Sequence, residues 1–428
     1  GKFTTVISLD DIYGWAFKDY YQGVYRANQV LLNVPNIAFA DQELKNRVLG
    51  QAHFLRGLYF FHLVNLYGRV PLPLDLELYH GQKTNEEGWQ QVISDFQKAE
   101  ELLPVSYTNL NGLDKGHTGR ATKGAAMAYL GKAYLFTKDF SKAKERFEKV
   151  INLGTYSLVS NYTDNFTETN ENNSESIFEL QFDRNIGGID LGWGGAPGSS
   201  WGKTSARAIT YGPPGFGFND IQPTKALFNE YQQEKTVSGA LDPRLGATMF
   251  YNHPGETLYG KDFAQNYASN PAYLNDVFTK KYQNYNNGSV SEYDWRSGIN
   301  ERLMRYADVL MMYAECLNDL GSTSQAYDYI QMVRNRVQLP DLRTTKPGMT
   351  QAQMREQIAH ERFLEFSLEG HRFDDIRRWG WLQDQSKLNW LKSRDSEFNT
   401  YSPGREYYPI PLTEIDNNPN NITQNPGW

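Results

Sequence analysis

The sequence lacks the residues and runs that several common classes of protein need. It holds one cysteine, Cys316, which excludes an internal disulfide framework, a cysteine-rich zinc site and a CxxC redox motif. Cys316 falls within an apolar helical pattern, so we expect it to be a small buried side chain. No apolar run approaches the roughly 18 residues of a membrane-spanning helix. The first residues also show neither the basic nor the apolar region of a signal peptide.

Clustered positive charge is absent as well. The chain has 43 Lys and Arg against 50 Asp and Glu, for a net charge of −7. Proteins that bind nucleic acid gather positive side chains on one surface to replace the counterions of the phosphates. No basic block of that kind occurs here, so we expect no nucleic-acid partner.

Catalytic and metal-binding motifs are also missing. The sequence has no HExxH, no GxSxG and no GxxxxGK[ST] motif. The Gly-rich stretch at 212–217 lacks the strand before it and the helix after it that a dinucleotide site requires. The seven histidines are scattered along the chain. We therefore predict no metal centre, no cofactor and no catalytic residues, although Asp374–Asp375 and Asp416–Asn418 could hold a structural calcium ion without EF-hand spacing.

The densest polar cluster lies between residues 360 and 379. Glu361, Glu365 and Glu369 follow each other at helical spacing on one face, where three like charges repel unless they are neutralised. Four arginines are close in sequence and could form bidentate pairs with them: Arg362, Arg372, Arg377 and Arg378. Acid–base catalysis is one interpretation of this cluster. We favour the other, a structural ion-pair network.

Most of the first 160 residues are predicted to be helical. Apolar and aromatic residues recur at helical spacing over 11–34, 41–67 and 85–103, and prolines follow the second and third of these stretches. Five residues then match the tetratricopeptide pattern of two antiparallel helices: Leu130, Gly131, Tyr134, Ala143 and Phe147. The pattern returns weakly within a second predicted helix pair at 303–338, at Tyr313, Ala314, Leu317, Ala326, Ile330 and Val333. These pairs predict a mainly α protein, with a partial solenoid that buries its core between neighbouring hairpins.

The middle of the chain, about 160–300, has a different character. A short strand is predicted at 176–182, and the stretch 183–220 is rich in Gly and Pro yet carries several aromatic residues, Phe218 among them. Sugars present flat C–H faces and a rim of hydroxyls, so their sites combine exposed rings with polar side chains. We select the following candidate ligand-binding residues: Trp193, Trp201, Arg207, Tyr211, Phe216, Asn219, Tyr293 and Trp295. We also expect half or more of these rings to pack inward and hold the loop. A further helix is predicted at about 350–369, and an extended tail at 407–428.

Several segments together resemble the SusD/RagB family of outer-membrane nutrient-binding lipoproteins. The most specific are RYADVLMMYAE at 305–315, HER at 360–362 with the later EGHR at 369–372, and DIRRW at 375–379. The stretch 50–72, the GRAT at 119–122 and the ending YPIP…NPGW at 408–428 agree with them. These segments occur in the order of the family and extend from about residue 15 to the end. The region 160–300 matches only loosely.

The resemblance implies a fold and a function. The fold is a tetratricopeptide-like helical-hairpin scaffold, here 10–158 and 300–340, with a loop-rich, partly β ligand-binding and capping half, here 159–299 and 341–428, all within one unit of 1–428. The function is non-catalytic capture of an oligo- or polysaccharide at the cell surface and its delivery to a TonB-dependent outer-membrane barrel of the SusC type. The family is lipid-anchored in the outer membrane on a cysteine that this chain lacks, so the anchor is expected from the resemblance alone.

Two alternatives remain open. The same fold could capture peptides for import, through backbone hydrogen bonds and a polar cavity. A glycoside hydrolase would need two carboxylates about 5–10 Å apart, and no motif in the sequence points to one.

Overall fold

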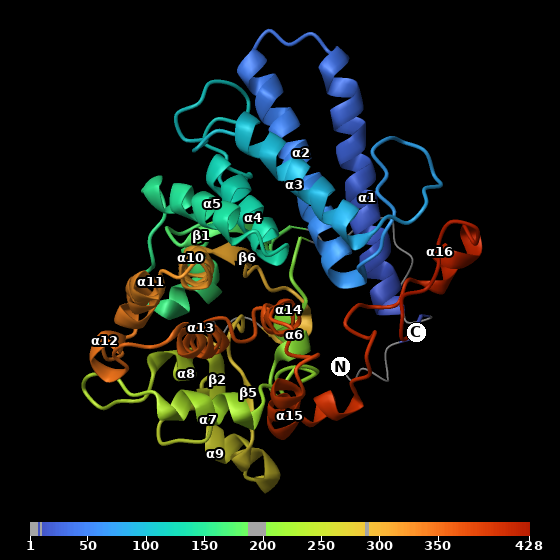
Figure 1. Ribbon diagram of the computed structural model, residues 1–428. Helices are drawn as coiled ribbons and strands as arrows, with labels where there is room; N and C mark the ends of the chain where they lie inside the picture. The colour runs from blue at the N-terminus through green and yellow to red at the C-terminus, as the bar shows by residue number, and fades with distance from the viewer. Residues whose placement is uncertain (1–6, 9–10, 187–202, 287–290) are drawn as a thin grey trace. The chain divides into compact units, whose positions relative to one another are not determined.

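The computed structural model describes residues 7–8, 11–186, 203–286 and 291–428 (Figure 1). Backbone contacts divide the chain into two compact units. Unit 1 consists of Gly1–Leu153 and Phe373–Trp428, and unit 2 is Gly154–Arg372. The fold is mainly α, as the sequence predicts, and its strands occur in short two-stranded pairs.

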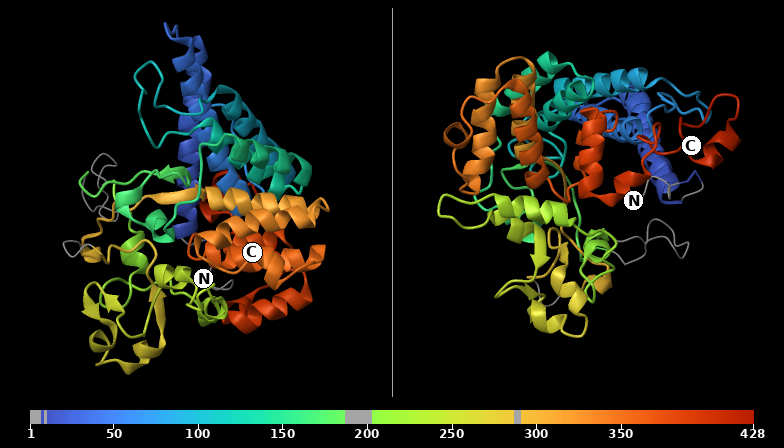
Figure 2. Two further views of the ribbon diagram at one scale, coloured as in Figure 1. Left: turned by 90° about the vertical axis from the view of Figure 1, so that its left-hand side faces the viewer. Right: turned by 60° about the horizontal axis from the view of Figure 1, so that its bottom comes forward.

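Unit 1 begins with a run of antiparallel helices, each of which packs against the next (Figures 1 and 2). They are α1 (Asp11–Asn33), α2 (Gln42–Tyr67), α3 (Asn85–Leu102), α4 (Lys123–Phe136) and α5 (Phe140–Asn152). A 3₁₀ turn, Val34–Asn36, follows α1. The predicted helices at 11–34, 41–67 and 85–103 are thus confirmed to within one residue.

Local signals in the sequence set the ends of these helices. The Thr84 hydroxyl accepts the Glu87 N–H while the Glu87 carboxylate accepts the Thr84 N–H, which forms a capping box at the start of α3. Gly68, with φ +73°, ends α2 in a conformation that a side chain disfavours.

The α4–α5 pair shows why the tetratricopeptide pattern needs glycine. Helix α4 is buried on all sides, whereas α5 is amphipathic, and Phe147 of α5 is fully buried against α4. A Cβ added at Gly131 would lie 2.6 Å from Cε1 of Phe147. The absence of a side chain at Gly131 therefore lets the two helices approach closely.

The last part of unit 1 is formed by the C-terminal residues. Its elements are α14 (Arg372–Arg378), α15 (Gln385–Arg394), the 3₁₀ turn Ser396–Thr400 and α16 (Leu412–Asn417). The prediction of a wholly extended tail at 407–428 was wrong, because α16 occurs within it. The tail is tied to α2 and to the loop that follows it by hydrogen bonds from the Tyr408 N–H to the Leu66 carbonyl, 2.8 Å, and from the Gln82 N–H to the Asn421 carbonyl, 3.1 Å.

Unit 2 contains short helices and strands before its long helices. The helices are α6 (Arg207–Tyr211), α7 (Lys225–Gln233), α8 (Pro243–Thr248), α9 (Phe263–Asn266), α10 (Tyr306–Asp319), α11 (Thr323–Arg336), α12 (Leu342–Thr345) and α13 (Gln351–Glu365). The strands are β1 (Ser176–Leu180), β2 (Met249–Tyr251), β3 (Thr257–Leu258), β4 (Lys261–Asp262), β5 (Val277–Thr279) and β6 (Glu301–Arg305). The 3₁₀ turns are Tyr162–Phe166, Glu168–Asn170, Pro271–Asn275 and Glu292–Asp294.

The second predicted helix pair is the α10–α11 hairpin. Its six pattern residues are all buried, and Cys316 is buried beside them in α10. The predicted start at 303 was wrong, because Glu301–Arg305 forms β6, which pairs antiparallel with β1 in the register Phe178↔Met304. The strand predicted at 176–182 is β1. Because they pair with the distant strand β1, the residues just before Tyr306 form a strand and not part of the helix.

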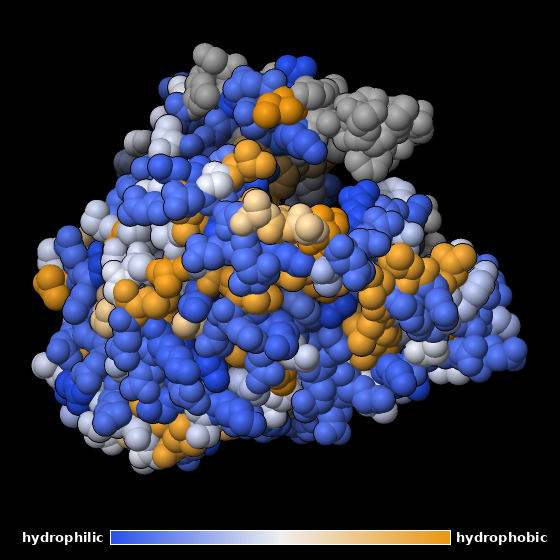
Figure 3. Space-filling model, turned by 90° about the horizontal axis from the view of Figure 1, so that it is seen from above, coloured by the Kyte–Doolittle hydropathy of each residue, from blue (hydrophilic) through white to orange (hydrophobic). Residues whose placement is uncertain are grey.

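An aromatic core supports the loop-rich part of unit 2. Strand β2 pairs with β5, β3 pairs with β4, and one cluster of buried residues contains Phe250, Leu258, Phe263, Tyr267 and Phe278. On the face seen in Figure 3, hydrophobic residues lie in small groups on a mostly hydrophilic surface. Among the described residues, no helix has the length and apolar character needed to cross a membrane.

Candidate functional site

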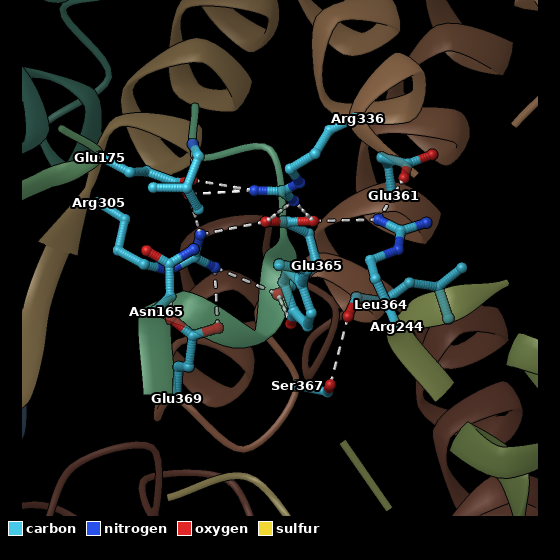
Figure 4. A network of polar contacts seen from close by, with 12 residues as sticks. Asn165, Glu175, Arg244, Arg305, Arg336, Glu361, Leu364, Glu365, Ser367 and Glu369 are labelled. Atoms are coloured by element: carbon cyan, nitrogen blue, oxygen red, sulfur yellow. Dashed lines mark hydrogen bonds and ion pairs between the residues drawn. The ribbon is translucent and has the colours of Figure 1, made fainter. Parts of the chain in front are cut away.

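The carboxylates predicted at 361, 365 and 369 lie in a buried network of charges in unit 2 (Figure 4). Glu361 pairs with Arg244 at 2.7 Å and with Arg334 at 2.9 Å. Glu365 pairs with Arg336 at 2.5 Å, Arg305 at 3.1 Å and Arg244 at 3.2 Å. Glu369 pairs with Arg305 at 2.8 Å and Lys281 at 3.0 Å. The structural interpretation of this cluster therefore holds.

The arginines that neutralise these carboxylates are not those that the sequence suggested. Arg362 bonds to Asp308 at 2.7 Å, Arg378 bonds to Asp375 at 2.7 Å, and Arg372 donates to the Ala359 carbonyl. Arg377, which belongs to unit 1, pairs with Asp374 and also contacts Asn65 of the same unit. The arginines close in sequence thus have other partners, because distant elements supply the ones that reach the glutamates.

Neighbouring charges keep the carboxylates of the network ionised. Burial by itself would raise the pKa of Glu365, but the positive charges of Arg336, Arg305 and Arg244 outweigh burial and lower that pKa to about 2. Burial is similarly outweighed at Glu369, where Arg305 and Lys281 lower the pKa to about 2. A permanently ionised, fully buried carboxylate is poorly suited to exchange protons with a substrate. These groups hold α13 against the elements around it.

The predicted ligand-binding residues separate into exposed and packed groups. Trp193 and Trp201 lie outside the described residues. Tyr293 and Trp295 are brought together with Phe218, whose ring centroid lies 6.1 Å from that of Tyr293 and 5.3 Å from that of Trp295. Phe218 is 47% exposed and Tyr293 is 48% exposed. These three residues form an accessible aromatic group in unit 2, which we call the aromatic platform.

Phe218 was not among the predicted site residues, although Phe216 was. The Phe216 ring stacks on Tyr259, with centroids 4.6 Å apart and planes 8° from parallel, against the buried aromatic cluster. Phe216 therefore holds the loop, as expected for part of the rings. On an extended segment, residues two apart point to the same side. A turn, in which the Phe216 and Gly217 N–H groups donate to the Pro213 carbonyl, gives Phe216 and Phe218 different surroundings, so the spacing did not identify the exposed ring.

Arg207 and Tyr211 also serve the loop. The Arg207 guanidinium pairs with the Glu301 carboxylate and donates to the Leu368 carbonyl. It lies 4.0 Å from the ring centroid of Tyr282 and 5.1 Å from that of Tyr211. These contacts occupy the charge of Arg207 within the protein and attach α6 to the β6 region.

Close backbone packing fixes the segment that carries Phe218. The Phe218 N–H donates to the Ile209 carbonyl at 2.8 Å, and the Asn219 N–H donates to the Gly212 carbonyl at 2.9 Å. A Cβ at Gly217 would lie 2.5 Å from the Ile209 carbonyl oxygen, so only glycine fits. Asn219 takes φ +55°, and its buried Oδ1 has no partner among the described residues. The segment 212–219 is therefore folded back on α6 in a defined conformation.

A buried polar network fixes the other side of the platform. The Glu292 carboxylate accepts the Tyr259 hydroxyl at 2.8 Å, the Asn284 N–H at 2.7 Å and the Asn284 side-chain amide at 2.9 Å. Burial raises the pKa of Glu292. Trp295 follows this turn with φ +57°. The three hydrogen bonds to Glu292 hold the backbone of the turn that carries Tyr293 and Trp295. The platform is thus preformed on both sides.

One group of the described residues could hold a metal ion. Asp75, Glu77 and His80 in unit 1 place ligand atoms within 4.8 Å of one another. The aspartates suggested for calcium at 374 and 375 form ion pairs with Arg377 and Arg378.

Comparisons with known proteins agree with this architecture. The profile of the SusD family matches residues 174–428, and one described as "Starch-binding associating with outer membrane" matches residues 3–135. SusD-like protein P25 of Formosa agariphila is 30% identical over 94% of this chain and 77% of its own length. A SusD superfamily protein of Bacteroides vulgatus superposes with a TM-score of 0.80 at 29% identity, over 96% of this chain and 85% of that one.

A protein named as laminarin-binding and SusD-like is also similar in structure. It gives a TM-score of 0.71 at 26% identity, over 96% of this chain and 85% of that chain. Profile, sequence and structure therefore agree on the resemblance noted from the motifs. The chain belongs to the SusD family.

Proposed function

We propose that this protein is a non-catalytic receptor that captures an oligo- or polysaccharide at the bacterial surface. The observation that carries the proposal is the aromatic platform. Two half-exposed rings and Trp295 are held by rigid backbone, where they could stack on the faces of sugar rings. A starch-binding family profile and a laminarin-binding relative support a glycan as the ligand class.

The charge of the chain favours a neutral glycan. With a net charge of −7, the protein would repel a strongly anionic polysaccharide during encounter. Affinity should be modest, because stacking on an open platform removes little area from water, and release of the glycan must follow.

The proposal includes delivery of the glycan to a TonB-dependent outer-membrane barrel of the SusC type. It also includes a lipid anchor in the outer membrane, on a cysteine outside this sequence. A barrel gene beside this one, with both products co-purifying from outer membranes, would support this part. A receptor found alone in the soluble fraction would contradict it.

Affinity gel electrophoresis tests the binding site. We expect the double variant Phe218→Ala/Tyr293→Ala to be retarded much less than the wild type in gels that contain the polysaccharide that retards the wild type, with laminarin and starch among those tried. Loss of one stacking ring should weaken binding about tenfold, which corresponds to about 1.4 kcal/mol. The melting temperature should change little, since both rings are half exposed.

Phe216→Ala is the matched control, two residues away and identical in chemistry. Because its ring packs against Tyr259, this variant should have a lower melting temperature than the wild type. Unchanged retardation of Phe218→Ala/Tyr293→Ala would remove the platform from the site. Release of reducing sugar by the pure wild type would contradict a non-catalytic role.

A further inference from the structure

We propose that a cavity in unit 1 is a second saccharide-binding site, which takes a neutral sugar residue independently of the aromatic platform. The cavity has a volume of about 620 Å³ and is lined by α1, by residues 71–80 and by α16 with the turn that follows it. Pockets of roughly 300–1,000 Å³ are typical of small-ligand sites. The proposal depends on the proposed function only for the class of ligand.

The cavity wall is built by buried hydrogen bonds. Asn28 of α1 is fully buried and donates its side-chain amide to the Pro73 carbonyl at 3.0 Å and to the Asp75 carbonyl at 2.9 Å. Arg56 donates to Asn28 Oδ1 at 2.9 Å, which fixes the orientation of that amide. The Tyr21 hydroxyl donates to the Pro71 carbonyl at 2.7 Å. Three carbonyls of the 71–75 segment are therefore held against α1.

The far end of the same segment is held as well. The Asn418 side-chain amide donates to the His80 carbonyl at 3.1 Å, and α16 thereby closes the cavity on that side. The loop is attached at both ends by side chains of α1 and of the C-terminal tail, so the cavity exists before any ligand enters.

Planar polar groups line the cavity without partners of their own. Among the described residues, the side chains of Gln22, Glu77, Asn417 and Glu414 form no hydrogen bond or ion pair. Burial raises the pKa of Glu414. Gln22, Glu77 and Asn417 are exposed and Glu414 is partly buried, so these groups are accessible to a ligand. Amides and carboxylates in this state can accept and donate the hydrogen bonds that sugar hydroxyls offer.

Exposed rings complete the site. Tyr25 is 44% exposed and Tyr79 is 67% exposed, and both line the cavity. Each offers a flat apolar face to a pyranose ring and a hydroxyl to its rim. Rings beside planar polar groups form the combination that a sugar requires.

The charges of the lining favour a neutral ligand over a cation. Asp75, Glu77 and Glu414 are accompanied by Lys18 and Arg26 at the same cavity, so the opposite charges nearly balance. The Asp75 Oδ1 already accepts the Glu77 N–H and the His80 Nε2, each at 2.9 Å. A bound metal ion would not need the two tyrosine rings. A second sugar site on one chain would instead raise the avidity for a long polysaccharide.

The experiment compares four proteins in affinity gels that contain laminarin or starch. They are the wild type, the platform variant Phe218→Ala/Tyr293→Ala, the cavity variant Tyr25→Ala/Tyr79→Ala, and the combination of both. Trp15→Ala is the matched control, because Trp15 is 51% exposed on the same helix as Tyr25 but does not line the cavity. We expect the cavity variant to lose at least tenfold in affinity, the combined variant to lose all retardation, and Trp15→Ala to match the wild type.

The outcomes separate the two sites. A platform variant with no residual binding, or a cavity variant that binds like the wild type, would overturn the second site and leave the proposed function standing. Binding that only the cavity variant reduces would overturn the platform and support the cavity. If chelation of divalent cations removes the residual binding and the tyrosine substitutions do not, the cavity is a metal site and the inference fails. A wild type that no polysaccharide retards would overturn both proposals.

Discussion

Replacing Glu365 by glutamine tests the buried charge network directly. The Glu365 carboxylate contacts Arg244, Arg305 and Arg336, and its pKa is lowered from 4.5 to about 2. At about 1.4 kcal/mol for each tenfold change in proton affinity, this corresponds to about 3 kcal/mol of stability at neutral pH. Removal of one member of a buried ion pair typically costs about 3–5 kcal/mol. We therefore expect Glu365→Gln to lower the free energy of unfolding of unit 2 by about 3 kcal/mol at pH 7.

The pH dependence of this effect has a definite sign. A carboxylate whose pKa is lowered by folding contributes stability that is present above its unfolded pKa, near 4.5, and is lost as the pH falls toward 2. The difference in unfolding free energy between the wild type and Glu365→Gln should therefore be constant above about pH 5 and shrink below it. Urea denaturation followed by circular dichroism at pH 7, 5, 4 and 3 measures this difference.

Glu356→Gln is the control for Glu365→Gln. Glu356 is exposed on the same helix, α13, so its replacement should change the unfolding free energy by no more than about 0.5 kcal/mol. A loss below about 1 kcal/mol for Glu365→Gln at pH 7, or a loss that does not change between pH 5 and pH 3, would refute the role assigned to the network.

Two further predictions concern packing and charge. Gly131→Ala should lower the unfolding free energy by about 1–2 kcal/mol in thermal denaturation, because its new Cβ would meet Phe147, whereas Gly14→Ala, with nothing within 4 Å, should stabilise α1 slightly. His360 lies 3.1 Å from Glu230 and 2.8 Å from Glu234, which outweigh burial and raise its pKa to about 9. The stability that protonated His360 contributes is therefore full below about pH 6.5 and is lost as the pH rises through 9. The difference in unfolding free energy between the wild type and His360→Gln should close over that range. A difference that widens would contradict the role assigned to His360.

Much of the helical scaffold could be predicted from local pattern. The stretches at 11–34, 41–67 and 85–103 carry apolar residues at helical spacing and end at glycine or proline, and these signals act within a few residues of chain. The Gly131–Phe147 pair was predictable because it belongs to a repeat of fixed spacing. The start of α10 was not, because residues 301–305 become a strand only through pairing with β1.

The candidate site was predictable as a region and not as a set of residues. The site was predicted in the Gly-rich loop and near 293–295, and the structure brings those two segments together at Phe218, Tyr293 and Trp295. Phe216 and Arg207 were also predicted as site residues, but their side chains pack inside the protein. Phe218 was not predicted. Whether a ring faces solvent depends on contacts with residues distant in sequence, such as Tyr259 for Phe216.

The amino-acid sequence alone determined the long helices of the scaffold, the class of fold and the family, because periodicity, caps and motifs are properties of neighbouring residues. Tertiary structure alone decided which arginine neutralises which glutamate, which rings remain exposed, and that α1, residues 71–80 and α16 share a cavity. The physical reason is that ion pairing, burial and cavities arise between side chains brought together by the whole fold, over separations that no local pattern records.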